Sequence, residues 1–548
     1  MLPRLSLPLS KTMLALLAIV FVAPGLLTHG PWKSLDAISI EIAHQMATRG
    51  DWLVPRVAGE AWMTQSPLFH WVGALFGDLL GTFIPFHGAV RLASALFTLA
   101  ALAAVYFAAR SAYGPLAMDT TDRQARRAPA ASALLLLVSS VGLFVHAHEA
   151  TPELAAMAAV AGVLAAAPHA VTAPLRAGLG AGLALGAGLL ATGPIVATAL
   201  LGALVLTALA DSDWRSARGL RFLLTAVVVA AALGAAWLVP LAARDATLLT
   251  DWWRESTTPE GVLLENLRYF LVVLSWASFP AWPLALWALW AHRRRLGTAE
   301  FLLPAFASLA LLLGLAAAGP ARELYTIVML PALALLAAPG AIALRRGAAA
   351  ALDWYAVMTF TFFGGLVWAG YCALMLGVPR KLAENALKMA PGFVARFDAV
   401  QFLSALLLSV AWLMLLFRLP RSATRGVTRW AAGMTLLWGT FATLYMPWAD
   451  YQKSYRAVAL QLKSRLPVGA ACISGRYLGP TQRAALSYHV GLITRPYDPT
   501  RPDACPLVLV QGSPHHELDA PGPRWDKLAD VGRPGDRSER YRLYRLVR

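Results

Sequence analysis

Positively charged residues fall in alternate gaps between long apolar segments, and this alternation limits the folds open to the chain. Apolar runs of roughly 17 to 25 residues, each long enough to span a bilayer, recur between residues 13 and 447. Loops on the cytoplasmic face of a membrane collect Lys and Arg, so clusters of arginine mark that face. The clusters are Arg110, Arg123, Arg126 and Arg127; Arg215, Arg218 and Arg221; Arg293, Arg294 and Arg295; Arg345 and Arg346; and Arg418, Arg421, Arg425 and Arg429.

The apolar runs predict a mainly α, polytopic membrane helix bundle of about thirteen transmembrane helices. An odd number of crossings places the N-terminus in the cytoplasm and the C-terminus outside, and every arginine cluster then falls inside. The apolar segment at residues 68–84 would move a cluster outside if it crossed, so we expect it on the outer surface of the bilayer. The predicted spans are residues 12–28, 89–110, 130–147, 153–169, 176–192, 194–210, 222–243, 267–291, 300–318, 323–344, 353–376, 400–417 and 430–447.

The composition agrees with a membrane protein. Hydrophobic residues make up 58% of the chain and charged residues 14%, whereas a soluble globular protein carries about 25% charged residues. A net charge of +17 would also suit a nucleic-acid-binding protein. The arginines, however, lie in short loops beside apolar segments, where they set topology and contact lipid headgroups. We therefore expect membrane lipids, and no nucleic acid, among the partners.

Three long loops and the C-terminal region are predicted to lie on the outer side of the membrane. The loops cover residues 28–88, 244–266 and 377–400, and extended loops packed on a helix bundle often carry function. Residues 448–548 contain strand-length apolar runs at 470–474, 507–511 and 541–547, and helical patterns at 454–466 and 480–490. The sequence therefore predicts a membrane domain at residues 1–447 and a small outer α/β domain at 448–548, with a loop at 521–540.

The chain has three cysteines. Cys372 lies in an apolar run and is expected to pack as a small hydrophobic side chain. Cys472 and Cys505 lie in the C-terminal region, and if that region is outside the cytoplasm, an oxidising compartment favours a disulfide between them. The alternative is a pair of unlinked buried thiols.

Short motifs are distributed along the whole chain. The first predicted outer loop contains Gly-Asp-Trp-Leu-Val-Pro at residues 50–55 and Thr-Gln-Ser-Pro-Leu at residues 64–68. The other motifs are Arg-Leu-Ala-Ser-Ala-Leu at 91–96, His-Ala-His-Glu-Ala-Thr-Pro-Glu-Leu at 146–154, Arg-Glu-Leu-Tyr at 322–325, and Pro-Trp-Ala-Asp-Tyr-Gln-Lys-Ser-Tyr at 447–455.

With these motifs in this order, the sequence resembles the polyprenyl-phosphate-sugar-dependent membrane glycosyltransferases. This family includes protein mannosyltransferases and the aminoarabinose transferases that modify lipid A, and the resemblance covers essentially the whole chain. It implies a C-type glycosyltransferase fold and a sugar donor carried on polyprenyl phosphate. It also implies a lipid or glycolipid acceptor at the periplasmic face of a bacterial inner membrane. The N-terminus would be cytoplasmic and the C-terminal domain periplasmic.

Several charged positions of the family motifs are replaced in this sequence. Aligned without gaps, the family's Asp-Glu pair falls on Leu35 and Asp36, so leucine occupies the position of the catalytic aspartate. A shift of one residue would bring Asp36 into that position. The family's Glu-Lys pair becomes Thr64 and Gln65, which removes a carboxylate and a phosphate-binding cation, and Thr192 replaces a later lysine.

The resemblance assigns the acceptor chemistry to two acidic residues. Asp36 would orient or deprotonate the acceptor, and Glu153, where the family usually has aspartate, would support the site. Both have a structural alternative, because an acid at the start of a helix also caps it or favours its dipole.

The donor phosphate needs cations to hold it as it leaves. Arg322, with Tyr325 near it, is the first candidate, because the usual lysine positions are lost. Its alternative is a pair with Glu323 or with lipid headgroups. The other candidate substrate-binding residues are Arg268, His148 and Glu149.

The run at residues 146–149 has a further interpretation. Imidazole and carboxylate groups bind divalent metal ions, so His146, His148 and Glu149 are candidate ligands. The spacing fixes no additional ligand, and a divalent metal ion is the only cofactor that the sequence suggests.

The leading function hypothesis is a glycosyltransferase that moves a sugar from polyprenyl phosphate to a periplasmic acceptor such as lipid A or another glycolipid. The replaced charges keep a second hypothesis open, a non-catalytic relative that binds polyprenyl lipid or partners another transferase. A transporter ranks last, because the sequence lacks the paired intramembrane charges and repeats expected there.

Overall fold

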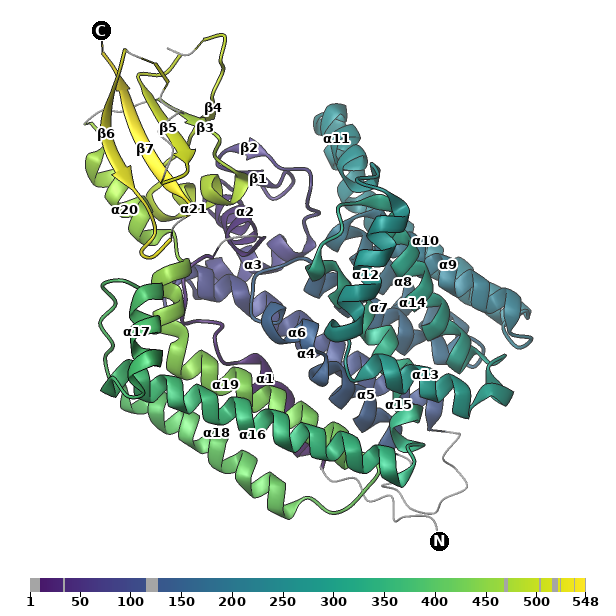
Figure 1. Ribbon diagram of the computed structural model, residues 1–548. Helices are drawn as coiled ribbons and strands as arrows, with labels where there is room; N and C mark the ends of the chain where they lie inside the picture. Colours follow the sequence, from purple (N-terminus) through teal and green to yellow (C-terminus); the bar gives the residue numbers. More distant parts are fainter. Residues whose placement is uncertain are drawn as a thin grey trace.

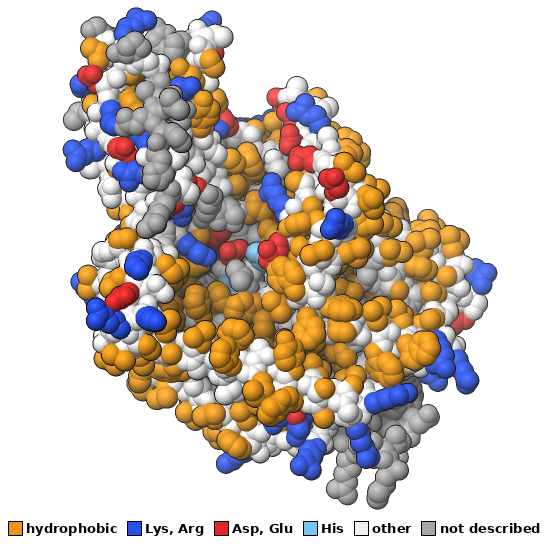
Figure 2. Space-filling view, in the orientation of Figure 1, with side chains coloured by type: hydrophobic (Ala, Val, Ile, Leu, Met, Phe, Trp, Pro, Cys, Tyr) orange, Lys and Arg blue, Asp and Glu red, His pale blue; other side chains and the backbone are white. Residues whose placement is uncertain are grey.

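The computed structural model describes residues 10–32, 35–114, 127–467, 472–501, 504–514, 521–522, 524–536 and 538–547. Two of the predicted cytoplasmic arginines, Arg123 and Arg126, lie outside these ranges. The described chain forms a large bundle of helices with a small sheet at one end (Figure 1). We call this the sheet end. The opposite end, along which Figure 2 shows Lys and Arg side chains below a belt of hydrophobic ones, is the arginine end.

The first half of the bundle contains a two-stranded ribbon between its second and third helices. Its elements are α1 (Lys11–Val22), α2 (Leu35–Arg49), β1 (Arg56–Val57), β2 (Glu60–Ala61), α3 (Leu68–Leu80), α4 (Phe86–Tyr113), α5 (Ala128–Ser139), α6 (Val141–His146), α7 (Glu153–Ala166), the 3-10 helix η3 (Ala167–His169), α8 (Pro174–Thr192), α9 (Pro194–Ala210) and α10 (Ala217–Arg244). The second half is helical throughout. Its elements are α11 (Ala246–Thr257), α12 (Leu263–Ala277), α13 (Ala281–Ala291), η4 (Arg293–Arg295), α14 (Ala299–Ala318), η5 (Glu323–Met329), α15 (Leu330–Ile342), α16 (Arg346–Leu376), α17 (Arg380–Met389), α18 (Ala399–Arg418) and α19 (Arg425–Lys453).

Every predicted span contains helix, although α1 ends at Val22 rather than at residue 28, and this confirms the mainly α membrane bundle. Within the described ranges, seven helices are long and apolar enough to cross a membrane, or eight if α12 and α13, bent by 94°, form one span. The predicted count of about thirteen is therefore larger than length and composition support. The difference arises because α1, α5, α7 with η3, and α9 are apolar but short, while α19 is long but more polar.

A stripe of glycines lets α8 and α10 pack closely. A Cβ atom added at Gly178 would lie 2.6 Å from Cβ of Thr225, and one added at Gly182 would lie 2.6 Å from Cβ of Val229. Real Cβ atoms do not approach so closely, so larger residues would push the two helices apart. This packing fixes the end of α8, where Thr192 borders the cavity described below.

The C-terminal sheet has the strand order β4-β3-β5-β7-β6. Strands β3, β4 and β5 are parallel neighbours, whereas β7 runs antiparallel to β5 and β6. The predicted loop at residues 521–540 is wrong in part, because β6 occupies seven of its residues. This strand is an edge strand with mostly solvent-accessible side chains, so its sequence lacks an apolar signal. The elements are α20 (Arg456–Arg465), β3 (Ile473–Arg476), α21 (Pro480–Val490), β4 (Arg495–Pro496), β5 (Leu507–Gly512), β6 (Trp525–Val531) and β7 (Arg540–Leu546).

A disulfide ties together the start of the sheet, and hydrogen bonds tie the end of α19 to the loop after α1. Cys472 and Cys505 form a disulfide with their Cα atoms 5.1 Å apart, just before the paired strands β3 and β5. Helix α19 continues to Lys453, beyond the predicted boundary at residue 447, and its Asp450 carboxylate accepts hydrogen bonds from N of Gly30 at 2.8 Å and Nε1 of Trp32 at 2.9 Å.

Helix α2 packs against α21 and so couples the bundle to the sheet region. The Glu41 side chain of α2 is fully buried there. Its Oε1 atom accepts a 2.6 Å hydrogen bond from Nε2 of Gln45, and the same nitrogen lies 3.4 Å from Oγ of Ser487 on α21. Burial raises the pKa of Glu41 to about 7, although the hydrogen bonds with Ser487 and Gln45 act in the opposite direction.

We expect the Glu41 carboxyl to make the folded protein less stable as pH rises. Because its folded pKa is about 7 and its ordinary value 4.5, its contribution is complete below pH 4.5 and is lost as pH rises through 7. The loss is on the order of 3 kcal/mol. Thermal unfolding in detergent between pH 4.5 and 8 checks this, with Glu41→Gln expected to flatten the pH dependence. Glu384→Gln, at an exposed ion pair on α17, is the control that retains it. Parallel curves for wild type and E41Q would contradict the assignment.

Candidate functional site

A cavity with about 990 Å³ of empty space lies at the sheet end of the bundle. The ends of α8, α11 and α14 meet there with the starts of α7, α9 and η5. The loop between β2 and α3 and the first residue of α2 close it. Its polar and charged lining residues are Thr64, Gln65, Glu153, Thr192, Glu255, Ser256, Glu260, Arg322 and Tyr325.

The cavity brings together three residues that the sequence predicted for the site. Glu153 starts α7 and is 6% exposed, and its carboxylate accepts a hydrogen bond from the Thr151 hydroxyl. Arg322 precedes η5, and Tyr325 lies within it. The Arg322 guanidinium is solvent-exposed and makes no ion pair within the described part of the chain. A carboxylate and an unpaired cation therefore share one cavity.

Two further carboxylates at the cavity are absent from the sequence predictions. Glu255 lies in α11 and Glu260 in the loop that follows it, and both are exposed. The signal available was an amphipathic helix with charged residues in a predicted outer loop, which is also typical of a helix on a membrane surface. Only the packing of α11 next to α9 brings these carboxylates to the cavity.

The positions where the family motifs carry charge also face this cavity. Leu35, Thr64 and Gln65 all line it. Gln65 is 7% exposed, and its Oε1 atom has no hydrogen-bond partner among the residues described. The Thr192 hydroxyl is similarly buried without a described partner. The neutral residues are thus placed where a ligand would meet them.

Asp36 has a different position from the one that its predicted role requires. It is 1% exposed and is not part of the cavity lining, which includes its neighbour Leu35. Its Oδ1 and Oδ2 atoms accept hydrogen bonds from Nε and Nη2 of Arg91 at 3.0 and 2.8 Å. N of Ala150 donates to Oδ1 at 2.8 Å and N of Trp32 donates to Oδ2 at 3.0 Å. Each carboxylate oxygen of Asp36 thus accepts two hydrogen bonds from the protein, and neither is free to contact a substrate.

The surroundings keep the Asp36 carboxyl ionised. Burial would raise the pKa of the Asp36 carboxyl, but the charge and hydrogen bonds of Arg91 hold it below its ordinary value. Arg91 is itself fully buried and also donates to O of His29 at 2.7 Å and O of Gly30 at 2.8 Å. Sequence reasoning missed this partner, although an arginine inside an apolar helix is a signal for a buried pair. Asp36 thus joins α2, α4 and the loop before α7.

The predicted His-x-His-Glu run divides between two environments. Nδ1 of His146 lies 3.2 Å from Oε2 of Glu149, and Nε2 of His146 lies 3.8 Å from Oε1 of Glu323. His148 stacks on Trp438 with ring centroids 4.2 Å apart, and its Nε2 lies 2.8 Å from O of Phe21.

The suggested metal site is therefore not formed as predicted. His146 is the last residue of α6 and His148 lies in the turn that follows, and their side chains point apart: His148 faces α1 and α19, while His146 faces η5. In the described ranges, no group of three or more His, Cys, Asp and Glu side chains has the geometry to hold a metal ion. Arg268, predicted to bind the donor, lies exposed on α12 and outside the cavity lining.

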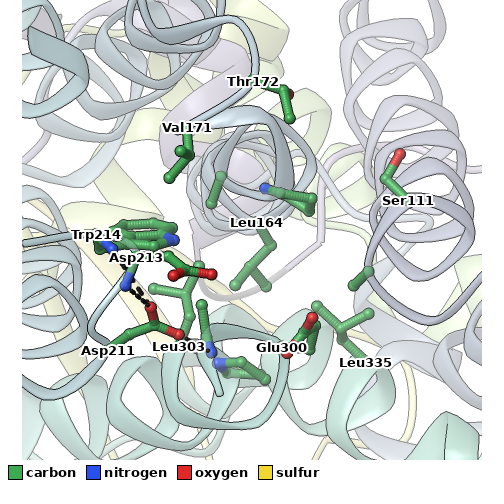
Figure 3. A pocket seen from close by; sticks show the side chains of 15 residues that line it. Ser111, Leu164, Val171, Thr172, Asp211, Asp213, Trp214, Glu300, Leu303 and Leu335 are labelled. Carbon is green, nitrogen blue, oxygen red and sulfur yellow. Dashed lines mark hydrogen bonds between the residues drawn. The ribbon is translucent and has the colours of Figure 1, made fainter. Parts of the chain in front are cut away.

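A second cavity, with about 950 Å³ of empty space, lies at the arginine end, between the end of α9 and the start of α14; Figure 3 shows the side chains that line it. Asp211 and Asp213 border it, and Glu300 lies across from them. The Asp211 carboxylate accepts hydrogen bonds from backbone N of Asp213 at 2.8 Å and of Ala299 at 2.8 Å, so it fixes the start of α14. Because the Asp211 carboxylate is already hydrogen-bonded to the backbone, we interpret this cavity as a structural junction between helices and not as a binding site.

The comparisons with known proteins concern the fold. No family model and no curated protein matches the sequence. The crystal structure of ArnT from Cupriavidus metallidurans bound to undecaprenyl phosphate is similar, with 18% identity, a TM-score of 0.70 and 97% of each chain covered. Apo ArnT from the same organism has a TM-score of 0.68 at 18% identity and the same coverage. The archaeal oligosaccharyltransferase AglB from Archaeoglobus fulgidus, at 12% identity, has a TM-score of 0.46 and covers 91% of this chain and 69% of its own.

The likeness to ArnT extends over the bundle and the C-terminal sheet together, because it covers almost the whole of both chains. It therefore confirms, at the level of the fold, the resemblance that the sequence motifs carry. The chain has the C-type glycosyltransferase fold that ArnT shows.

Proposed function

We propose that this protein is a membrane glycosyltransferase that uses a sugar carried on polyprenyl phosphate. The observation that supports it most is the cavity at the sheet end, where Glu153 and Arg322 meet Gln65, whose buried Oε1 atom has no hydrogen-bond partner among the residues described. The fold is that of ArnT, whose crystal structure holds undecaprenyl phosphate.

The residues of the cavity match the needs of glycosyl transfer. A sugar that leaves phosphate develops positive charge at its anomeric carbon, and the carboxylate of Glu153 would stabilise that charge. Polyprenyl phosphate leaves as an anion, to which the Arg322 guanidinium and Nε2 of Gln65 would donate hydrogen bonds. Tyr325, Thr64 and Thr192 would add hydroxyl groups to the site.

The orientation in the membrane follows from the arginines. We infer that the arginine end is cytoplasmic and that the sheet end lies in the periplasm of a bacterial inner membrane. The cavity would then receive a donor lipid from the outer leaflet and a lipid or glycolipid acceptor such as lipid A. An impermeant thiol reagent should label a cysteine placed at Gly392 in intact cells and should not label one placed at Gly347.

Binding and transfer test the proposal separately. We expect Arg322→Gln to weaken binding of undecaprenyl phosphate about 10- to 100-fold, because a charge-assisted hydrogen bond contributes roughly 1.5–3 kcal/mol. The measurement uses labelled undecaprenyl phosphate and protein in detergent, and Arg254→Gln, at an exposed pair with Asp251, is the matched control. Transfer is measured with undecaprenyl phosphates that carry radiolabelled sugars and a bacterial lipid extract. Equal affinity for wild type and R322Q would contradict the phosphate assignment.

A second candidate function is a non-catalytic protein that binds polyprenyl lipid or partners another transferase. The placement of Leu35, Thr64 and Gln65 on the cavity surface favours it, because charged residues occupy these motif positions in the family. Undecaprenyl phosphate binding without transfer of any sugar in the panel would support this candidate.

A further inference from the structure

A histidine and two glutamates meet beside the cavity but do not line it. Nδ1 of His146 lies 3.2 Å from Oε2 of Glu149. Its Nε2 is buried and has no hydrogen-bond partner in the described part of the chain, and Oε1 of Glu323 is 3.8 Å away. With Nδ1–H donating to the carboxylate, a neutral imidazole keeps a lone pair on Nε2 and accepts a proton there. This is the arrangement of a histidine base oriented by a carboxylate.

The two glutamates differ in how firmly they are held. The Glu149 backbone is anchored, because Oγ of Ser94 donates to its O atom at 2.7 Å and its N atom donates to O of His146 at 3.3 Å. The next residue, Ala150, is bonded to Asp36. The Glu323 side chain is 49% exposed, so a group that enters from the solvent can displace it and reach Nε2.

His146 lies behind one wall of the cavity. Glu153 and η5 form this wall, with Arg322 and Tyr325 facing the cavity and Glu323 facing His146. The negative charges of Glu149, Glu323 and Glu153 favour the protonated form of His146, and the positive charge of Arg322 favours the ionised form of Glu153. Figure 2 shows acidic and histidine side chains at the floor of a hollow between the sheet region and the region of α11, directly above the hydrophobic belt. A membrane-bound acceptor can enter there.

We propose that His146 is the general base for a neutral hydroxyl acceptor, which would reach Nε2 by displacing the Glu323 side chain, and that Glu149 is its positioning residue. This inference rests on the glycosyl transfer proposed above and adds the class of acceptor. The position of the family's catalytic aspartate supplies no base in this chain. Leu35 cannot accept a proton, and both oxygens of Asp36 are bonded to Arg91 and backbone N–H groups.

The transfer step balances with the donor and the acceptor alone. The acceptor oxygen forms a bond to the anomeric carbon as the bond from that carbon to the phosphate oxygen breaks. Polyprenyl phosphate leaves with the electron pair of the broken bond and is bound by Arg322. The acceptor proton passes to Nε2 of His146, where Glu149 stabilises the imidazolium, and it is returned to water after the product leaves.

The charges around His146 decide the class of acceptor. Three carboxylates, Glu149, Glu153 and Glu323, act on it, and Arg322 is the cation on the same wall. A phosphate acceptor among them would meet like charges, which disfavours its binding. It would also need no base, because it is already anionic. A hydroxyl group carries no charge and needs a base, so it fits the cluster on both counts.

The experiment measures transfer from undecaprenyl phosphates carrying radiolabelled sugars to a bacterial lipid extract, used intact or after phosphatase treatment. We expect His146→Gln to lower kcat about 100-fold and to leave the Kd for undecaprenyl phosphate unchanged. The wild-type rate should fall as pH decreases through the imidazole range, and the residual H146Q rate should not. Glu149→Gln should shift that fall to lower pH. His169→Gln, at an exposed histidine of η3, is the matched control and should behave as wild type. Transfer should survive phosphatase treatment of the acceptors.

The outcomes separate this inference from the proposed function. Wild-type kcat in H146Q would exclude His146 as the base. Transfer that is lost after phosphatase treatment, or a product that releases its sugar in mild acid as a glycosyl phosphate does, would exclude the hydroxyl acceptor. Each of these results leaves a working transferase. Wild-type protein that transfers no sugar would overturn both proposals together.

Discussion

Replacing Glu153 with glutamine is expected to lower kcat for sugar transfer about 1000-fold while the protein still binds undecaprenyl phosphate. The change keeps the size of the side chain and its hydrogen bond with Thr151 but removes the negative charge from the cavity. Removing one group that stabilises transition-state charge typically costs 100- to 1000-fold in rate. The binding of the lipid phosphate depends on Arg322 instead, so its Kd should change little.

The measurement compares single-turnover transfer by wild type, Glu153→Gln and Glu260→Gln. Glu260 also lines the cavity but is exposed, so its charge is screened by water and its loss should change the rate much less. Equal rates for wild type and E153Q would remove Glu153 from the reaction. A large fall in E260Q alone would move the electrostatic role to α11 and its following loop.

Replacing Asp36 with asparagine is expected to destabilise the fold by about 3–5 kcal/mol, because it leaves the buried Arg91 charge unpaired. The pair has both side chains fully buried, with Oδ2 of Asp36 2.8 Å from Nη2 of Arg91. The backbone of Trp32 and Ala150 would also lose a charged acceptor. Thermal unfolding in detergent should show a midpoint several degrees below that of wild type.

A surface pair supplies the control for this prediction. Asp251 also pairs with an arginine, Arg254, at 3.2 Å, but the two side chains are 47% and 68% exposed. Asp251→Asn should cost less than about 1 kcal/mol, because water screens an exposed pair. Activity per folded molecule of D36N should stay close to wild type, since Asp36 acts through structure. A catalytic Asp36 would give the reverse pattern, with unchanged stability and lost transfer.

The motifs at the helix ends pointed to residues that the structure brings together. Glu153, Arg322 and Tyr325 were identified from sequence, and they share one cavity. Each lies at or near a helix terminus at the sheet end, so the topology deduced from hydropathy already placed them at the same end of the bundle. Arg268 shows the limit of this reasoning, because it shares that end of the bundle but lies outside the cavity lining.

By itself, the sequence determined the helices and the end of the bundle at which each loop lies. A segment in a bilayer must satisfy its backbone hydrogen bonds internally, so each apolar run forms a helix whatever its neighbours are. The tertiary structure decided which side chains of those helices face the cavity. Neighbouring residues of a helix point about 100° apart, so Leu35 and Asp36 of α2 cannot both face it. Arg91, from a different helix, binds Asp36 and so turns Leu35 toward the site. That choice depends on a contact between residues far apart in the sequence, which the local pattern does not encode.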